Sequence, residues 1–294
     1  MYDIDYNERD ISFKLEGKSF DNGYDFNDTL MSLNYFQDIL DKAYLTIVNK
    51  DRMSKNDRTI YKVKATEIRK GSFIADLMIY TGSAMQIGFS VLNTYYPSLL
   101  LDITKQGFEY LKTVLQAEKD GKRISVSNNG DGDVMILNIE GDSNAPIYVG
   151  ANAFDFADRA YNSIRDLSSM IDNDNVKKIN IFDKTEKRNI MKLGIKEKEI
   201  LNVEPKTDET PIFITGRIFR IDVRAKTGKM IVVKSEIEDL INGEFNFEIL
   251  DSSDISKCCS VIGREAEFGV FRRIQYDPIK LTNQVIYLRV FKVK

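Results

Sequence analysis

Two hydrophobic periods alternate along the first two thirds of the chain. A period of two residues, as in Ile11, Phe13 and Leu15, indicates a strand with one buried face, and apolar residues three or four positions apart indicate an amphipathic helix. The turn sequence NNGDGD between two short apolar runs predicts a hairpin. Together these patterns predict strands at 11–15, 58–68, 124–128, 134–139, 146–149 and 179–182, and helices at 30–48 (capped by Asn27 or Asp28), 103–119, 154–171 and 185–201.

The longest uncharged stretch runs from Leu77 to Leu101 and is long enough to cross a bilayer, which takes about 20 residues. Ten of its residues are polar, Gly or Pro, however, and that composition is unfavourable in lipid. We therefore expect a buried helix interrupted near Pro97, or an oligomer interface. A membrane-active segment is the alternative.

The pattern changes after residues 202–211 (NVEPKTDETP), which carry two of the five prolines and four charges. They predict a mixed α+β domain over 1–202, a linker at 203–211 and a second domain over 212–294. Beyond the linker the chain is mostly β, with a short helix or turn at 254–259. Five strands in so short a segment predict a small β-barrel, OB-like or SH3-like. We expect these strands at 213–223, 230–233, 245–250, 267–274 and 285–293.

Composition narrows the chemistry. The chain has no histidine, which excludes catalytic triads and zinc sites that require imidazole and lowers the expectation of an enzyme. The two cysteines, Cys258 and Cys259, are adjacent and cannot clasp a metal together as a CxxC pair does. The net charge of −3 does not indicate a strongly basic protein, and the acidic, polar N-terminus is not a signal peptide. We expect a cytoplasmic, non-enzymatic protein without metal or cofactor.

Glu16-Gly17-Lys18 at the end of the first strand matches one half of a metal-dependent nuclease site. In such a site the carboxylate holds Mg²⁺ and the lysine stabilises charge on the phosphate. The other half should be an acidic residue on a neighbouring strand. Asp10 is too close in sequence, and neither Glu67 nor Asp76 has support. A solvated strand end is the favoured interpretation.

Asn129, Asp131, Asp133 and Glu140 occupy the first, third, fifth and twelfth positions of an EF-hand count. The sixth position requires Gly for a sharp turn, and Val134 stands there instead. The following residues have the pattern of a strand. A hairpin is therefore favoured over a calcium loop.

Basic and aromatic residues are interleaved in the predicted barrel. On an OB-like sheet, cations that follow phosphates and rings that stack on bases are typical of single-stranded nucleic-acid binding. Residues 206–294 contain 15 basic and 13 acidic residues, a net of +2, which favours contact with a protein partner instead. The candidate partner-binding residues are Arg217, Arg220, Arg224, Lys226, Lys229, Arg272 and Arg273, and the aromatic residues are Phe213, Phe219, Phe271, Tyr276 and Tyr287.

Several short structural motifs carry a resemblance to known proteins. They are Leu15-Glu16-Gly17, the turn Gly71-Ser72-Phe73, the hairpin Asn129-Gly130…Gly141-Asp142, Gly216-Arg217-Ile218 and the turn Lys226-Thr227-Gly228-Lys229. With them the chain resembles a group of uncharacterised prokaryotic and phage proteins of bacterium–phage conflict. In length and organisation it is also similar to phage-encoded inhibitors of the Gabija defence complex, which coat their target as oligomers.

The resemblance implies a non-enzymatic, oligomerising protein-interaction module in a phage–host conflict system, acting in defence or anti-defence. Its partners would be another protein and further copies of the chain. The alternatives are a single-stranded nucleic-acid-binding protein that uses the C-terminal barrel and a membrane-active effector that uses residues 77–101.

Overall fold

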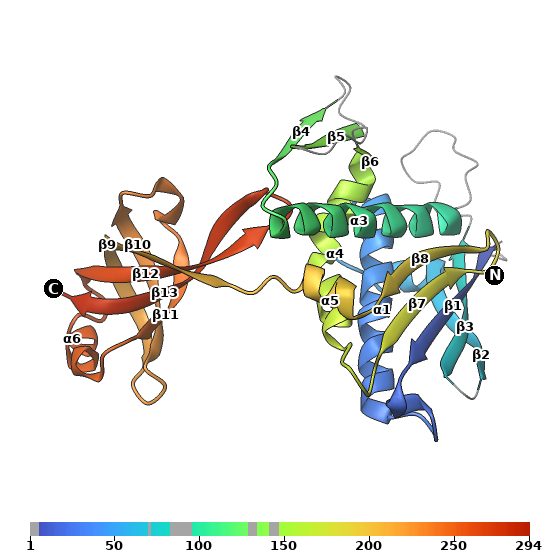
Figure 1. Cartoon of the computed structure of the whole chain (residues 1–294), viewed down its shortest axis with the longest axis horizontal. Helices are drawn as coiled ribbons and strands as arrows, with labels where there is room; N and C mark the ends of the chain where they lie inside the picture. The colour runs from blue at the N-terminus through green and yellow to red at the C-terminus, as the bar shows by residue number, and fades with distance from the viewer. Residues whose placement is uncertain (1–5, 70–71, 83–95, 129–133, 141–146) are drawn as a thin grey trace. The chain divides into compact units, whose positions relative to one another are not determined.

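The computed structural model describes residues 6–69, 72–82, 96–128, 134–140 and 147–294 (Figure 1). The chain divides into two compact units, an N-terminal unit over Met1–Asn202 and a C-terminal unit over Val203–Lys294. The N-terminal unit contains β1 (Tyr6–Glu16), η1 (Lys18–Phe20), α1 (Phe26–Ile47), α2 (Asp57–Ile60), β2 (Tyr61–Arg69), β3 (Phe73–Gly82), α3 (Tyr96–Lys119), β4 (Ile124–Asn128), β5 (Val134–Ile139), β6 (Ile147–Gly150), α4 (Ala151–Ser169), β7 (Lys178–Asp183), β8 (Arg188–Leu193) and α5 (Ile195–Leu201).

The N-terminal unit is built on an antiparallel sheet with the strand order β2-β3-β1-β7-β8. Helices α1, α3 and α4 pack together on one side of this sheet (Figure 1). The alternation of β1 points Ile11, Phe13 and Leu15 into the core, where Phe13 stacks on Phe36 of α1 with 4.8 Å between ring centroids. Strands β4, β5 and β6 form a separate small sheet, so the hairpin predicted at 124–139 is confirmed. Residues 129–133 of the EF-hand count lie outside the described residues.

The prediction of a helix beginning at Leu77 is wrong, because residues 77–82 complete strand β3. Leu77 and Ile79 are buried and lie in register with β1, which makes this a central strand with one face in the core. Residues 83–95 lie outside the described residues. Pro97 does not interrupt a helix but lies in the first turn of α3, where its missing N–H removes no helical hydrogen bond. Among the described helices, none combines the length and apolar character that a membrane crossing requires.

The prediction of one helix over 185–201 is also wrong. Residues 188–193 form strand β8, which pairs with β7 across a tight turn where Lys187 adopts a left-handed conformation (φ 52°). The helix that follows, α5, is confined to residues 195–201. Its first turn is closed by the Glu197 side chain, which accepts a hydrogen bond from the backbone N–H of Gly194.

Two further boundaries differ from the sequence prediction. Helix α1 begins at Phe26, and its N-cap is Asp25, whose side chain accepts a hydrogen bond from the backbone N–H of Asp28 at 2.9 Å. The predicted caps, Asn27 and Asp28, therefore lie inside the first turn. The strand predicted at 58–68 begins only at Tyr61, because residues 57–60 form the short helix α2.

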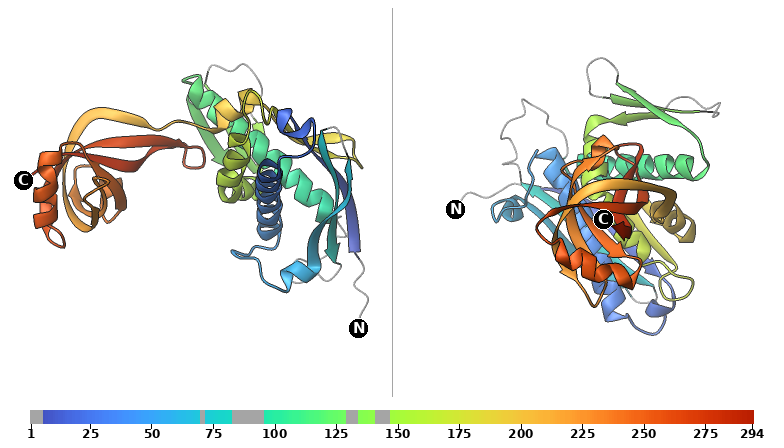
Figure 2. Two further views of the ribbon diagram at one scale, coloured as in Figure 1. Left: turned by 90° about the horizontal axis from the view of Figure 1, so that it is seen from below. Right: turned by 90° about the vertical axis from the view of Figure 1, so that its left-hand side faces the viewer.

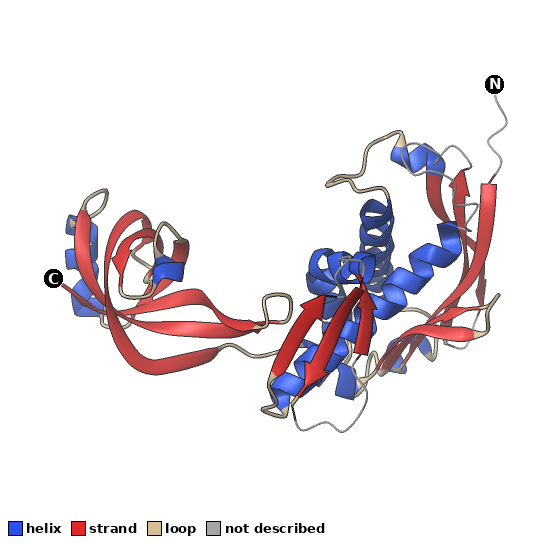
Figure 3. Cartoon of the chain, turned by 90° about the horizontal axis from the view of Figure 1, so that it is seen from above, coloured by secondary structure: helices blue, strands red, loops and turns tan. Residues whose placement is uncertain are grey.

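The C-terminal unit is a closed ring of five strands (Figures 2 and 3). Every strand bonds to two neighbours, in the order β10-β11-β13-β12-β9. Only β11 and β13 are parallel. The inward side chains form one core, which includes Phe247, Phe268 and Cys258 of the short helix at one end. The elements are β9 (Lys206–Asp222), β10 (Thr227–Ser235), η3 (Glu238–Leu240), β11 (Glu244–Ile249), η4 (Ser252–Asp254), α6 (Ile255–Ser260), β12 (Glu265–Asp277) and β13 (Thr282–Val293).

The linker predicted at 203–211 is too long, because β9 begins at Lys206. Residues 206–208 pair with residues 272–274 of β12, so the proline-containing segment forms the start of the longest strand of the ring. Pro211 is exposed and lies within a register shift of β9 against β12, where a missing backbone N–H is tolerated. Between α5 and β9, residues 202–205 have no regular secondary structure.

Candidate nucleic-acid interface

The seven predicted basic residues fall in two places on the ring. Five lie on the first hairpin, which consists of β9, β10 and the turn at 223–226, and two lie next to each other on β12. The hairpin carries Arg217 and Arg220 on β9, Arg224 and Lys226 in the turn and Lys229 on β10, while β12 carries Arg272 and Arg273.

Strand pairing brings three of these residues into one row across the outside of the ring. Arg220 pairs with Lys229, Lys229 with Asn246, and Arg273 with Tyr287. The parallel register of β11 and β13 places Asn246 beside Tyr287. Side chains opposite each other on one face of a sheet lie about 5 Å apart at Cβ. We call Arg220, Lys229, Asn246, Tyr287 and Arg273 the outer row.

A β-bulge in β9 adds an aromatic ring beside the outer row. Arg220 pairs with Lys229 and Ile218 with the next residue of β10, so Phe219 has no cross-strand partner. The bulge leaves both Phe219 and Arg220 exposed, and the Phe219 side chain is 45% exposed. Bulges commonly redirect side chains next to binding sites.

Four of the seven candidate basic residues have no internal partner. They are Arg217, Arg220, Arg224 and Arg273, and no ion pair or side-chain hydrogen bond joins them to another described residue. Acidic groups of the unit bind other cations instead, as in the 3.0 Å pair between Lys229 and Glu244. The C-terminal unit therefore has a small net charge as a whole but an excess of positive charge around the outer row.

Tyr287 presents an uncharged ring in the middle of these cations. Burial raises the pKa of its hydroxyl and Glu248 raises it further, while Arg273 and Arg289 act in the opposite direction. The net direction is upward, so the phenol stays protonated at neutral pH. A neutral phenol offers a π-face to an aromatic ligand and an O–H as a hydrogen-bond donor.

A shallow cavity of about 320 Å³ opens along the outer row. Gly228 is one of its lining residues, and a Cβ atom there would come within 2.5 Å of the Arg220 carbonyl oxygen and 2.5 Å of the Phe247 ring. Only glycine allows β9, β10 and the Phe247 ring to approach this closely. The cavity is lined by Arg220, Asp222, Thr227, Gly228, Lys229, Asn246 and Tyr287.

Arg272 does not join the outer row. It alternates with Arg273 along β12, so its side chain leaves the opposite face of the strand, where it forms an ion pair with Asp208. Its side chain is 17% exposed and lines a second cavity of the ring. Arg272 and Arg273, which the sequence analysis grouped in one site, therefore lie on opposite faces of β12 and belong to different sites.

The other predicted motif, Glu16-Gly17-Lys18, remains a solvated strand end. Glu16 pairs with Lys14 at 2.5 Å, and Lys18 pairs with Asp174 at 2.9 Å. Asp76 pairs across the sheet with Ser12, four positions before Glu16. Its carboxylate forms ion pairs with Arg69 and Lys184. Across the described part of the chain, no three acidic, His or Cys side chains gather as metal ligands.

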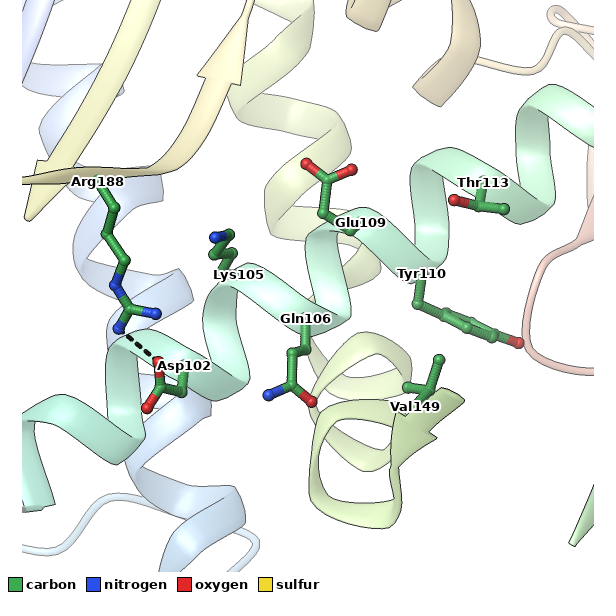
Figure 4. A pocket seen from close by; sticks show the side chains of 8 residues that line it. All are labelled: Asp102, Lys105, Gln106, Glu109, Tyr110, Thr113, Val149 and Arg188. Carbon is green, nitrogen blue, oxygen red and sulfur yellow. Dashed lines mark hydrogen bonds and ion pairs between the residues drawn. The ribbon is translucent and has the colours of Figure 1, made fainter. Parts of the chain in front are cut away.

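The N-terminal unit also has a cavity, of about 240 Å³, along α3 (Figure 4). Arg188 of β8 reaches Asp102 of α3 across one end of it, and Arg188 also pairs with Glu186 at 2.8 Å. Lys105 and Glu109 supply one further charge of each sign. Because these charges largely neutralise one another, the cavity attracts a charged ligand less than the outer row does.

Asn246 is the member of the outer row that sequence reasoning missed. The alternation of Glu244, Asn246 and Glu248 with buried residues marks it as outward-facing, but a single Asn in a strand carries no chemical signal. Its place between Lys229 and Tyr287 depends on non-local register.

Comparisons with protein-family models, curated proteins and solved structures found no match to this chain.

Proposed function

We propose that the C-terminal unit is an OB-like barrel that binds single-stranded nucleic acid across the outer row. The observation that carries this proposal is the row itself, in which an aromatic ring and an amide lie between cations, two of which have no internal partner. Single-strand binding proteins combine a basic groove that follows the backbone with rings that stack on the bases.

The topology of the ring supports the OB-like assignment. The first strand pairs with the second and the fourth, the third and fifth strands are parallel neighbours, and helix α6 connects the third strand to the fourth. This helix and the parallel pair favour the OB-like over the SH3-like alternative. OB barrels bind oligonucleotides on the face of their second and third strands, which here are β10 and β11, and through flanking loops.

Each member of the outer row has a chemical task in this proposal. Arg220 and Arg273 neutralise phosphates on either side of the row, and Lys229 contributes when its pair with Glu244 opens. Tyr287 stacks on one base, and Phe219 is exposed for a second. The amide of Asn246 has both a donor and an acceptor for a base edge.

A protein-interaction role is the second candidate, and a different surface favours it. Phe213, Phe271 and Phe291 cluster on the outside of β9, β12 and β13, with 6.2 Å and 4.9 Å between the ring centroids of Phe291 and the other two. The Nζ atom of Lys294 lies over the Phe213 ring, 4.6 Å from the ring centroid. Surface aromatics of this kind are enriched at protein interfaces. The oligomeric, phage–host setting of this candidate rests on the sequence resemblance.

Fluorescence anisotropy with labelled DNA and RNA strands of about 12 nucleotides tests the proposal. The logarithm of affinity should fall with the logarithm of salt concentration, with a slope of about −0.7 for each phosphate contact. The double variant Arg220→Ala with Arg273→Ala should reduce that slope by about 1.4. Arg264→Ala, which removes an exposed arginine from the turn before β12, is the matched control.

Tyr287→Ala should weaken binding roughly 5- to 150-fold, the range that follows from about 1–3 kcal/mol per stacked base. Tyr287→Phe keeps the ring and should bind nearly as the unaltered protein does. Equal losses for Arg264→Ala and the outer-row variants would refute a role for the row. No binding tighter than micromolar at about 150 mM salt would favour the protein-interaction candidate.

A further inference from the structure

Three phenylalanine rings lie on the same outer face of the ring of strands as the outer row. We call them the phenylalanine cluster, which consists of Phe213 on β9, Phe271 on β12 and Phe291 on β13. A β-bulge leaves Phe291 without a cross-strand partner in β12, and a Cβ atom on Gly269 would come within 2.6 Å of its ring. Gly269 stands between two core residues of β12, so it faces outward, and Phe291 covers it there. The cluster is therefore an outer surface, and Phe213 is 47% exposed.

The phenylalanine cluster begins one step beyond the outer row. Arg273 pairs with Tyr287 in the row, and two residues away on each strand Phe271 pairs with Arg289. Side chains two residues apart on a strand share a face and lie about 7 Å from each other. Phe271 is thus the next ring after Tyr287. Arg273 neighbours both rings, one across the strands and one along its own strand.

The charges beside the phenylalanine cluster suit a polyanion that carries aromatic bases. Arg273 has no internal partner among the described residues, and the Nζ atom of Lys294 lies over one ring of the cluster, 4.6 Å from its centroid. The nearby carboxylates of Glu248 and Glu267 are each held in an ion pair, with Arg289 and Lys294. Cations beside exposed rings are what single-strand binding proteins present to phosphates and bases.

We propose that the bound strand continues from the outer row onto the phenylalanine cluster, which stacks further bases. This inference rests on the proposed function of the outer row. Arg273 would neutralise the phosphate between the base on Tyr287 and the base on Phe271, and Lys294 would approach a phosphate beyond it. Because every base has a face that can stack on a ring, this extension adds affinity without adding sequence preference.

The dimensions of the sheet give the length of strand that each part holds. The outer row crosses five strands, and four strand spacings of about 4.8 Å amount to roughly 19 Å. From Tyr287 to Phe291 the chain advances four residues, or about 13 Å. At about 3.4 Å per nucleotide, a stacked strand needs roughly six nucleotides for the row and four more to reach the end of the cluster.

The test compares thymine strands of about 6 and 12 nucleotides, lengths within the range of one OB fold. The unaltered protein should bind the longer strand roughly 5- to 150-fold more tightly, the range for one further stacked base. Phe213→Leu with Phe271→Leu removes two rings but keeps apolar side chains. This variant should lose most of the advantage of the longer strand and bind the shorter strand as the unaltered protein does. Phe213→Tyr with Phe271→Tyr keeps the rings and should keep the advantage.

Thermal unfolding shows whether each variant remains folded, and Phe213→Leu alone serves if the double variant does not, because that side chain is already half exposed. If the unaltered protein binds both lengths equally, the extension is refuted while the outer row stands. An advantage that survives loss of the rings also refutes it and leaves the cluster to a protein partner. Equal weakening of both lengths by the leucine variant contradicts it as well. If the unaltered protein binds neither strand, the proposed function fails together with this inference.

Discussion

The buried ion pair between Arg9 and Asp183 joins β1, the central strand of the N-terminal sheet, to its neighbour β7. Arg9 Nε and a terminal nitrogen donate to the two carboxylate oxygens of Asp183 at 3.1 Å and 2.7 Å. The backbone N–H groups of Thr185 and Glu186 donate to the same carboxylate at 3.1 Å and 3.2 Å. The Asp183 side chain is fully buried and that of Arg9 is 7% exposed.

Asp183→Asn keeps the shape of this side chain but removes its charge. The Arg9 guanidinium then retains only Glu186, which lies 2.5 Å away and is 41% exposed. Breaking one partner of a buried pair usually costs about 3–5 kcal/mol. Because Glu186 remains, we expect a loss near the lower end, about 3 kcal/mol. Replacing both partners with apolar residues, Arg9→Met with Asp183→Leu, removes the unpaired charge but leaves the backbone N–H groups of Thr185 and Glu186 without their acceptor, so it should restore only part of that loss.

The loss should also depend on pH. Burial raises the pKa of Asp183, but Arg9, the backbone N–H of Glu186 and Arg188 together lower it below its usual value. A carboxylate with a lowered folded pKa stabilises the protein above the unfolded pKa of about 3.9. That stabilisation disappears as the pH falls through the folded value. The difference between the unaltered protein and Asp183→Asn should therefore be full at pH 7 and shrink below about pH 4.

Urea unfolding followed by circular dichroism and tyrosine fluorescence measures these differences, since the chain has no tryptophan. A double-mutant cycle of the unaltered protein, Arg9→Met, Asp183→Leu and the variant with both substitutions gives the coupling between Arg9 and Asp183. A loss below about 1 kcal/mol for Asp183→Asn at pH 7, or a loss that does not change with pH, would show that this pair does not anchor the sheet.

Three further predictions concern the C-terminal unit. A fragment of residues 203–294 should fold alone, because its core is closed within the ring, and a non-cooperative thermal transition would contradict this. Gly228→Ala should destabilise the unit by about 1–3 kcal/mol through overpacking, whereas Gly150→Ala, whose new methyl group meets no atom closer than 3.7 Å, should not have this effect. Burial raises the pKa of Cys258 to about 11, so a thiol reagent at pH 8 should modify only Cys259 until urea exposes the second thiol.

The local hydrophobic period was sufficient to assign much of the secondary structure. It was insufficient where contacts with distant parts of the chain decide between helix and strand. The alternation around Phe13 and the helical spacing after it identified β1 and α1. Residues 77–82 were misassigned because a central strand with few charges on either face has no clear period of two. Residues 188–193 were misassigned because their charges also fit a helix, and only pairing with β7 selects the strand.

The candidate site shows the same division. The basic residues of the first hairpin could be grouped from sequence because they are near neighbours along the chain. The alternation of side chains along a strand predicts that the Arg272 and Arg273 side chains point to opposite faces of β12, but it does not predict which of them faces outward. That choice depends on the bulges of β12 and on its pairing with Tyr287, contacts that no local pattern encodes.

The central position of β1 has a consequence for the newly made chain. This strand precedes the other described strands along the chain, yet one of its two neighbours is β7, which begins roughly 160 residues after β1 ends. At about 5–20 residues per second, a ribosome needs on the order of 8–32 s to supply that neighbour. Until then one edge of β1 lacks its partner strand. Strand β3 covers the other edge of β1, so the edge that awaits β7 needs cover from a chaperone or the ribosome surface during synthesis. That cover would determine what fraction of the newly made chains avoids aggregation.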